Sequence, residues 1–194
     1  MKIYGTTTSP FVRRLRVVAA EVGEPIERVD TATDAGMALL REVSPIRKVP
    51  VAMIDDRPLF DSRAIVDWLT ARRGWGGLAP PGEALWESNV LNAIDGALDS
   101  VIQLFYLRRD GVAIDGTPYA DRQLERADAI FAWLATQLRP REPQGLGFVE
   151  VALICALDWM DFRKTYPTER AAGLAWLREA WRERPSLVAT RPHL

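Results

Sequence analysis

Cysteine and histidine are almost absent from this sequence, which has one of each in 194 residues. A single thiol, Cys155, cannot form an internal disulfide, a CxxC redox pair or a cysteine-based zinc cluster. The one histidine, His193, argues against a Ser-His-Asp hydrolase and a multi-histidine metal site. We therefore expect no metal ion. We interpret Cys155, which lies in an apolar run, as a buried filler and His193 as a solvated residue.

The sequence also lacks an excess of charge of one sign, because its 25 Lys and Arg residues nearly balance its 26 Asp and Glu residues. Phosphate binding usually shows as a basic excess on one face, so we expect no nucleic-acid partner. No apolar signal region follows Met1, and we identify no apolar stretch long enough to span a bilayer. The sequence therefore predicts a soluble protein of the reducing cytoplasm without a membrane partner.

The first third of the chain alternates strand patterns with helix patterns. Apolar residues at Phe11, Leu15, Val18 and Val22 follow one helix face, and Gly23 provides a stop. Strands are predicted over 3–4, 26–29, 51–54 and 57–60, and helices over 11–22, 35–43 and from 61–62 onward. The predicted order is therefore β-α-β-α-β-β-α.

Glycine and proline concentrate in residues 74–82, where every periodicity breaks. We predict a first domain over 1–75, a linker over 76–82 and an all-helical second domain over 83–194. Residues 148–159 are apolar nearly all round, which is typical of the central helix of a bundle. A last helix carrying Leu174, Leu177 and Trp181 is expected to end at Pro185. We expect Asp158 and Asp161 to pair with Arg163 or Lys164.

Three motifs in this order give the sequence a family resemblance. They are Thr8-Ser9-Pro10-Phe11-Val12-Arg13-Arg14, Lys48-Val49-Pro50-Val51 and Phe60-Asp61-Ser62-Arg63-Ala64-Ile65. Together they resemble the cytosolic glutathione S-transferases, particularly bacterial members with a Thr-Ser-Pro-Phe motif near the N-terminus. The resemblance covers essentially the whole chain. It implies an α/β thioredoxin-like N-terminal domain (βαβαββα) followed by an all-α helical-bundle C-terminal domain.

The resemblance implies a glutathione site, and the chemistry of these residues fits one. An extended tripeptide can pair with a strand edge, and we predict a cis bond between Val49 and Pro50, which lets Val49 offer its N–H and C=O. Ser62 and neighbouring N–H groups at a helix start suit a carboxylate, although this could be only a helix start. Asp61 could pair with the ammonium group and Lys48 with the other carboxylate, or Lys48 could be solvated.

Ser9 is the residue we expect to face the glutathione sulfur, with Phe11 beside it. A hydrogen bond to a charged group supplies about 1.5–3 kcal/mol, and lowering a thiol pKa by about two units needs roughly 2.7 kcal/mol. Thr7 and Thr8 are close enough to compete, and Ser9 could be only a helix cap before Pro10. In this reading the nucleophile is the sulfur of glutathione, which is a co-substrate.

The second substrate has the weakest signal. Between the domains, Phe105, Tyr106 and Arg109, with Leu104 and Arg108, are candidate walls for a hydrophobic electrophile. The resemblance implies transferase activity, a role in detoxification and a homodimer. The alternatives are a glutathione-dependent isomerase or dehalogenase and a non-catalytic protein-binding module of the same fold. Tyr4 is expected to pack its ring rather than to act, and Glu150 to serve as the acidic member of a cap that begins at Gly147.

Overall fold

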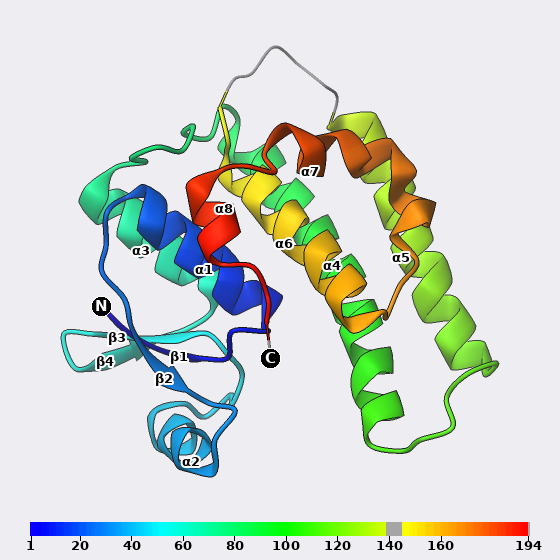
Figure 1. The fold of residues 1–194 in the computed structure, drawn as a ribbon, viewed down its shortest axis with the longest axis horizontal. Helices are drawn as coiled ribbons and strands as arrows, with labels where there is room; N and C mark the ends of the chain where they lie inside the picture. Colours follow the sequence, from blue (N-terminus) through cyan, green and yellow to red (C-terminus); the bar gives the residue numbers. More distant parts are fainter. Residues whose placement is uncertain (139–144, 194) are drawn as a thin grey trace.

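The computed structural model describes residues 1–138 and 145–193, which form a sheet half and a helical half (Figure 1). The elements of the sheet half are β1 (Lys2–Gly5), α1 (Pro10–Glu21), β2 (Glu27–Asp30), α2 (Asp34–Val43), β3 (Val51–Ile54), β4 (Arg57–Leu59) and α3 (Ser62–Arg73). Those of the helical half are α4 (Ala84–Arg109), α5 (Pro118–Gln137), α6 (Phe148–Arg163), the 3-10 turn η1 (Thr168–Leu174), α7 (Ala175–Ala180) and α8 (Pro185–Ala189). This architecture confirms the predicted fold class and the predicted order of the first seven elements.

The sheet has the strand order β2-β1-β3-β4, with β1 parallel to β2 and antiparallel to β3. Helices α1 and α3 pack against each other on one side of it, and α2 lies on the other (Figure 1). The apolar face of α1 predicted from the sequence is buried, with Val12, Leu15 and Val18 all at 0% exposure. Burying such side chains contributes about 1.5–3 kcal/mol each.

The helical half is built around α6, which the sequence predicted as the central helix. Its residues from Val151 to Leu157 are all buried, and it contacts both α1 and α4. Cys155 is buried as expected, and burial raises the pKa of its thiol to about 12. The apolar side chains of α6 belong to one continuous core that also includes Ile3 of β1 and Leu69 of α3. The two halves therefore share a core.

A smaller core lies under α2. It consists of Tyr4, Leu40 and Val51, and Tyr4 is only 4% exposed. This confirms that the tyrosine packs its ring in the strand.

The C-terminal part of the chain differs from the prediction of one last helix ending at Pro185. Leu174 closes the 3-10 turn η1, α7 ends at Ala180, and Trp181 follows it. Pro185 instead begins α8. The reason is that proline has no N–H to give and its fixed φ suits the first helical position, so it starts helices as readily as it stops them.

The cap of α6 follows the expectation for Gly147 and Glu150. The Gly147 N–H donates to Glu150 Oε2 at 3.1 Å, although a glycine cannot supply the reciprocal side-chain bond. The cap therefore satisfies one of the donors at the helix start.

Helix α4 corrects the expectation that no apolar stretch could span a bilayer. Among the described residues it is the one helix long and apolar enough, by length and composition, to do so. In the structure α4 packs against α5 and α6, and Val90, Ile94, Ala97 and Val101 belong to the core. Packing on these two neighbours buries part of its apolar surface.

The predicted partners of Asp158 and Asp161 are wrong. Asp158 pairs with Arg13 of α1 at 2.7 Å and with Arg178 of α7 at 2.9 Å, and Arg178 also reaches Asp161 at 2.6 Å. The Arg13 side chain is only 3% exposed, and it also donates to the Leu187 carbonyl of α8. This cluster ties α1 to three C-terminal helices, which local sequence spacing could not show.

We expect Asp158→Asn to lower the free energy of unfolding by about 2 kcal/mol, because it leaves a buried guanidinium without its counter-charge. Urea unfolding followed by circular dichroism measures this. Asp161→Asn is the matched control, since that carboxylate is 40% exposed and pairs with Arg178 alone among the arginines that the structure describes, and it should cost under about 1 kcal/mol. Equal losses in the two variants would contradict the assignment.

Candidate functional site

The sheet topology brings the three predicted motifs to one edge. Tyr4 near the end of β1 pairs with Val51 at the start of β3, and Ala52 pairs with Leu59 at the end of β4. The chain leaving β1, the chain entering β3 and the chain leaving β4 therefore meet at the same edge of the sheet. Ser9, Val49 and Asp61 lie on these three segments, so residues far apart in the sequence become neighbours in the fold.

The turn after β1 carries four hydroxyl groups. Ser9 is the N-cap of α1, and its Oγ accepts a hydrogen bond from the Val12 N–H at 3.3 Å. Thr7 donates to the His193 carbonyl at 3.0 Å, and Thr6 and Thr8 share a hydrogen bond at 3.3 Å. His193 itself is exposed, as expected. Among the described residues, the hydrogen of Ser9 has no recorded acceptor, and the same holds for whichever of Thr6 and Thr8 accepts their shared hydrogen bond.

The chain entering β3 has the geometry predicted for it. The Val49–Pro50 peptide is cis, which confirms the prediction. Val49 is half-buried, Pro50 is buried, and Lys48 before them is exposed. The backbone of Val49 precedes the first residue of β3, beyond the part of the strand that pairs with β1.

Asp61 and Ser62 begin α3 but have different environments. Asp61 is exposed, and its Oδ1 accepts from the Arg63 N–H at 2.8 Å, so it caps the helix. Ser62 is 0% exposed, and its Oγ accepts two hydrogen bonds from Arg14, at 3.0 Å from Nε and 2.7 Å from Nη2. A hydroxyl has two acceptor lone pairs and one hydrogen. Arg14 therefore occupies both lone pairs of Ser62 and leaves its O–H as a donor.

Arg14 is the residue of this site that the sequence reasoning missed. Its guanidinium donates to Asp95 of α4 at 2.6 Å and lies 4.8 Å from the ring centre of Phe11 and 5.7 Å from that of Phe148. The side chain is only 3% exposed. The available signal was two adjacent arginines, Arg13 and Arg14, inside a helix whose other residues are mostly apolar. Such charges are buried only with partners.

The residues proposed to line the second-substrate site differ in their exposure and in their contacts. Phe105 packs edge-on against Trp159 at 5.6 Å, and Tyr106 beside it is exposed. Leu104 is fully buried in the core. Arg108 pairs with Asp115 and Arg109 with Asp110, so both guanidinium charges already have carboxylate partners.

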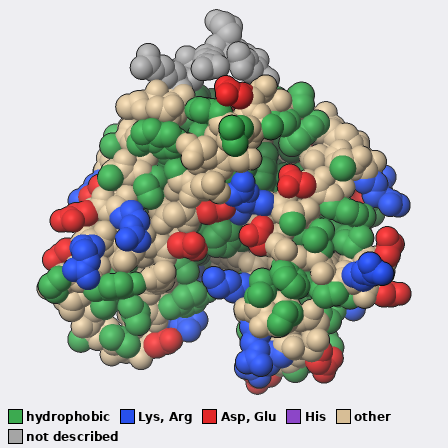
Figure 2. All heavy atoms as spheres, turned by 180° about the vertical axis from the view of Figure 1, so that it is seen from behind, with side chains coloured by type: hydrophobic (Ala, Val, Ile, Leu, Met, Phe, Trp, Pro, Cys, Tyr) green, Lys and Arg blue, Asp and Glu red, His purple; other side chains and the backbone are tan. Residues whose placement is uncertain are grey.

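The surface is indented between the two halves, and side chains of both charge signs gather around the indentation (Figure 2). The face seen there is the one opposite to that in Figure 1.

Comparison with known proteins agrees with this architecture. Residues 3–88 match the family model of the glutathione S-transferase N-terminal domain. The comparisons support the glutathione S-transferase family. An uncharacterized glutathione S-transferase-like protein, YibF of Escherichia coli K12, is 26% identical over 177 residues, which cover 86% of this chain and 85% of that protein.

Solved structures show the same fold over the whole chain. A glutathione S-transferase from Methylobacillus flagellatus with glutathione bound has a TM-score of 0.86 at 24% identity, with 99% of each chain covered. A glutathione transferase family member from Pseudomonas fluorescens Pf-5 with bound glutathione has a TM-score of 0.82 at 24% identity, covering 100% of this chain and 99% of that one. The glutathione S-transferase fold therefore extends through the helical half, beyond the family-model match.

Ser62→Ala is expected to destabilise the protein even without a ligand. The change leaves two buried Arg14 N–H groups without an acceptor, at a cost of about 1–3 kcal/mol. Thermal or urea unfolding of the free protein measures the loss. Ser88→Ala, which changes a half-buried serine of α4 outside this network, should stay within about 0.5 kcal/mol of the parent. An unchanged Ser62→Ala protein would show that Arg14 does not depend on this hydroxyl.

Proposed function

We propose that this protein is a glutathione S-transferase that binds glutathione at the sheet edge and activates its thiol for attack on a hydrophobic electrophile. The observation that carries the proposal is the meeting of Ser9, the cis Val49–Pro50 peptide and the Asp61–Ser62 helix start at one edge. The relatives crystallised with glutathione support it, since they share the fold along the whole chain.

Ser9 is the hydroxyl we propose to hold the thiolate. Its hydrogen has no recorded acceptor among the described residues, whereas that of Thr7 goes to the His193 carbonyl. Ser9 also lies at the start of a 12-residue helix, where the backbone dipole favours a negative charge. Both effects stabilise the thiolate relative to the thiol, with Phe11 proposed as its neighbour on the first helical turn.

The γ-glutamyl end is proposed to lie at the start of α3. We propose that a carboxylate accepts from the N–H groups at the start of α3 and from the Ser62 hydroxyl, whose hydrogen has no recorded acceptor among the described residues, and that the exposed Asp61 carboxylate meets the ammonium group. Val49 is proposed to pair its backbone with the tripeptide, and the exposed Lys48 to reach the other carboxylate.

The electrophile is proposed to bind beside Phe105 and Tyr106. We propose that Arg109 lines the site of the electrophile. Because its guanidinium already pairs with Asp110, we do not expect it to bind an anionic group of the substrate. We also propose a cytoplasmic homodimer, domains over 1–75 and 83–194, and a role in detoxification. Glutathione binding without turnover would favour the non-catalytic alternative.

Ser9→Ala should slow conjugation while leaving glutathione affinity nearly intact, because only the sulfur contact is lost. A loss of about 2 kcal/mol of thiolate stabilisation raises the pKa of the bound thiol by roughly one and a half units. Ultraviolet titration of the thiolate in the complex measures the shift.

Thr7→Val is the control for Ser9→Ala, since it removes a hydroxyl already engaged by the His193 carbonyl. It should leave the titration in place. A shift in the Thr7 variant without one in the Ser9 variant would refute the assignment of the thiol-facing residue.

Asp61→Asn should weaken glutathione binding by about fivefold, because the amide oxygen can still cap α3 but no longer offers a charge to the ammonium group. Calorimetry with glutathione measures the affinity. Asp67→Asn is the matched control, since Asp67 is another exposed aspartate of α3 and lies more than one turn further on. Equal affinities in the parent and the Asp61 variant would sink this placement.

A further inference from the structure

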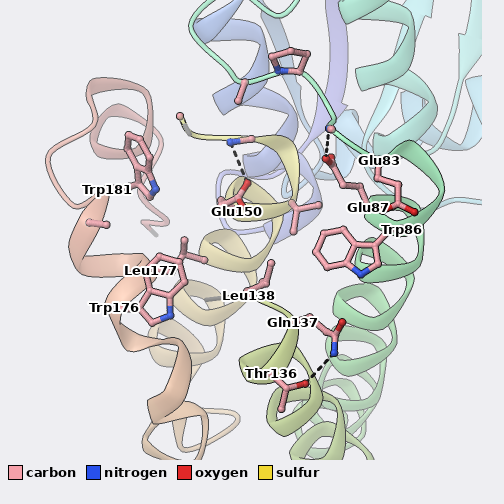
Figure 3. Close-up of a pocket in the computed structure, with 17 residues that line it drawn as sticks. Glu83, Trp86, Glu87, Thr136, Gln137, Leu138, Glu150, Trp176, Leu177 and Trp181 are labelled. Carbon is pink, nitrogen blue, oxygen red and sulfur yellow. Dashed lines mark hydrogen bonds between the residues drawn. The ribbon is translucent and has the colours of Figure 1, made fainter. Parts of the chain in front are cut away.

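A cavity of about 750 Å³ lies in the helical half, between α4, the end of α5, the start of α6 and α7 (Figure 3). It shares no residue with the candidate glutathione site. Its volume falls in the range of about 300–1,000 Å³ that small-molecule sites occupy. The proposed transferase function gives it no role.

Three glutamates line this cavity: Glu83 and Glu87 near the start of α4 and Glu150 in the first turn of α6. Glu87 accepts from the Gly82 N–H at 2.8 Å and Glu150 from the Gly147 N–H. Within residues 1–138 and 145–193, no lysine or arginine lines the cavity, and none forms a salt bridge with any of the three. The cavity therefore carries negative charge without a neutralising cation among the described residues.

The environment of the cavity changes the pKa of one of the three glutamates. Burial raises the pKa of the Glu150 carboxyl above its ordinary value, and the nearby charge of Glu87 adds to the effect. The two carboxylates come from different helices and line the same cavity. A positively charged ligand between them would favour the charged form of both.

Three tryptophans complete the walls. Trp86 lies on the α4 side, and Trp176 and Trp181 lie on the opposite side, with Glu150 between the two sides (Figure 3). The face of an indole attracts cations more strongly than any other aromatic side chain does. The Trp176 side chain is half-buried, and its Nε1 is buried without a hydrogen-bond partner in the described part of the chain.

We propose that this cavity binds an organic cation, namely a quaternary or protonated amine that carries an apolar body. The ammonium group lies among the carboxylates and indole faces, and the apolar body packs against Leu138 and Leu177. This combination of acidic and aromatic walls selects for charge and disfavours anions.

Benzoylcholine is a suitable probe, because it combines a trimethylammonium group, an ester and an aromatic ring. Its neutral isostere is 3,3-dimethylbutyl benzoate, in which carbon replaces the charged nitrogen. Calorimetry on the full-length protein, with tryptophan fluorescence as a second readout, should show binding of benzoylcholine that is at least about fivefold tighter than that of the isostere. Equal affinities would overturn the proposal, since charge would then play no part.

The double variant Glu83→Gln/Glu87→Gln should weaken benzoylcholine binding by about fivefold. Its matched control is Glu42→Gln/Glu125→Gln, which removes the same charge at two exposed glutamates outside the cavity. The control should bind like the parent. Equal weakening in both double variants would overturn the proposal, because it would reflect net charge alone.

A third arm concerns Arg139 and Arg141, which follow Leu138 in the sequence but lie outside the described residues. Arg139→Gln/Arg141→Gln should leave benzoylcholine binding unchanged or tighter. Binding that appears only in this variant would overturn the proposal, since the chain's own arginines would then occupy the cavity. Glutathione affinity, measured in parallel, should be the same in all these variants, which separates this site from the proposed transferase site.

Discussion

The ion pair between Arg14 and Asp95 is the interaction on which the arrangement of this molecule depends. The Nη1 of Arg14, a residue of α1, lies 2.6 Å from Oδ1 of Asp95 on α4. Its Nε and Nη2 donate to the hydroxyl of Ser62 at the start of α3. A buried guanidinium is tolerated only when its donors are satisfied, so the three helices are constrained together. The position of α3 relative to α1 is thereby coupled to the helical half.

Arg13, the next residue on the same helix, faces another direction and anchors the C-terminal helices through Asp158 and the Leu187 carbonyl. Successive helical positions point about 100° apart, so two adjacent arginines can serve two different interfaces. Together they turn α1 into the common support of the sheet edge, α6 and α8. The candidate glutathione site begins at the N-terminus of this same helix, so its Ser9 is held by a well-anchored element.

The two sites proposed for this protein depend on opposite uses of charge. At the sheet edge, the helix starts and the hydroxyl groups of Ser9 and Ser62, whose hydrogens have no recorded acceptor in the described part of the chain, offer donors that suit a thiolate and a carboxylate. In the cavity of the helical half, Glu87, Glu150 and the indole rings offer negative charge and π faces, which suit a cation. The lining of each site therefore selects a different chemistry within one fold.

The sequence by itself determined the order of the first seven elements, the apolar helix faces and the three motifs, because these follow from residue periodicity and from local turn and cap preferences. It also predicted the cis bond before Pro50, which the structure confirms. Only the tertiary structure decided that Pro185 starts a helix. It also decided that Asp158 pairs with Arg13 and that Ser62 accepts hydrogen bonds from Arg14. These contacts join residues separated by up to 145 positions, and packing across the shared core selects such partners where local pattern cannot.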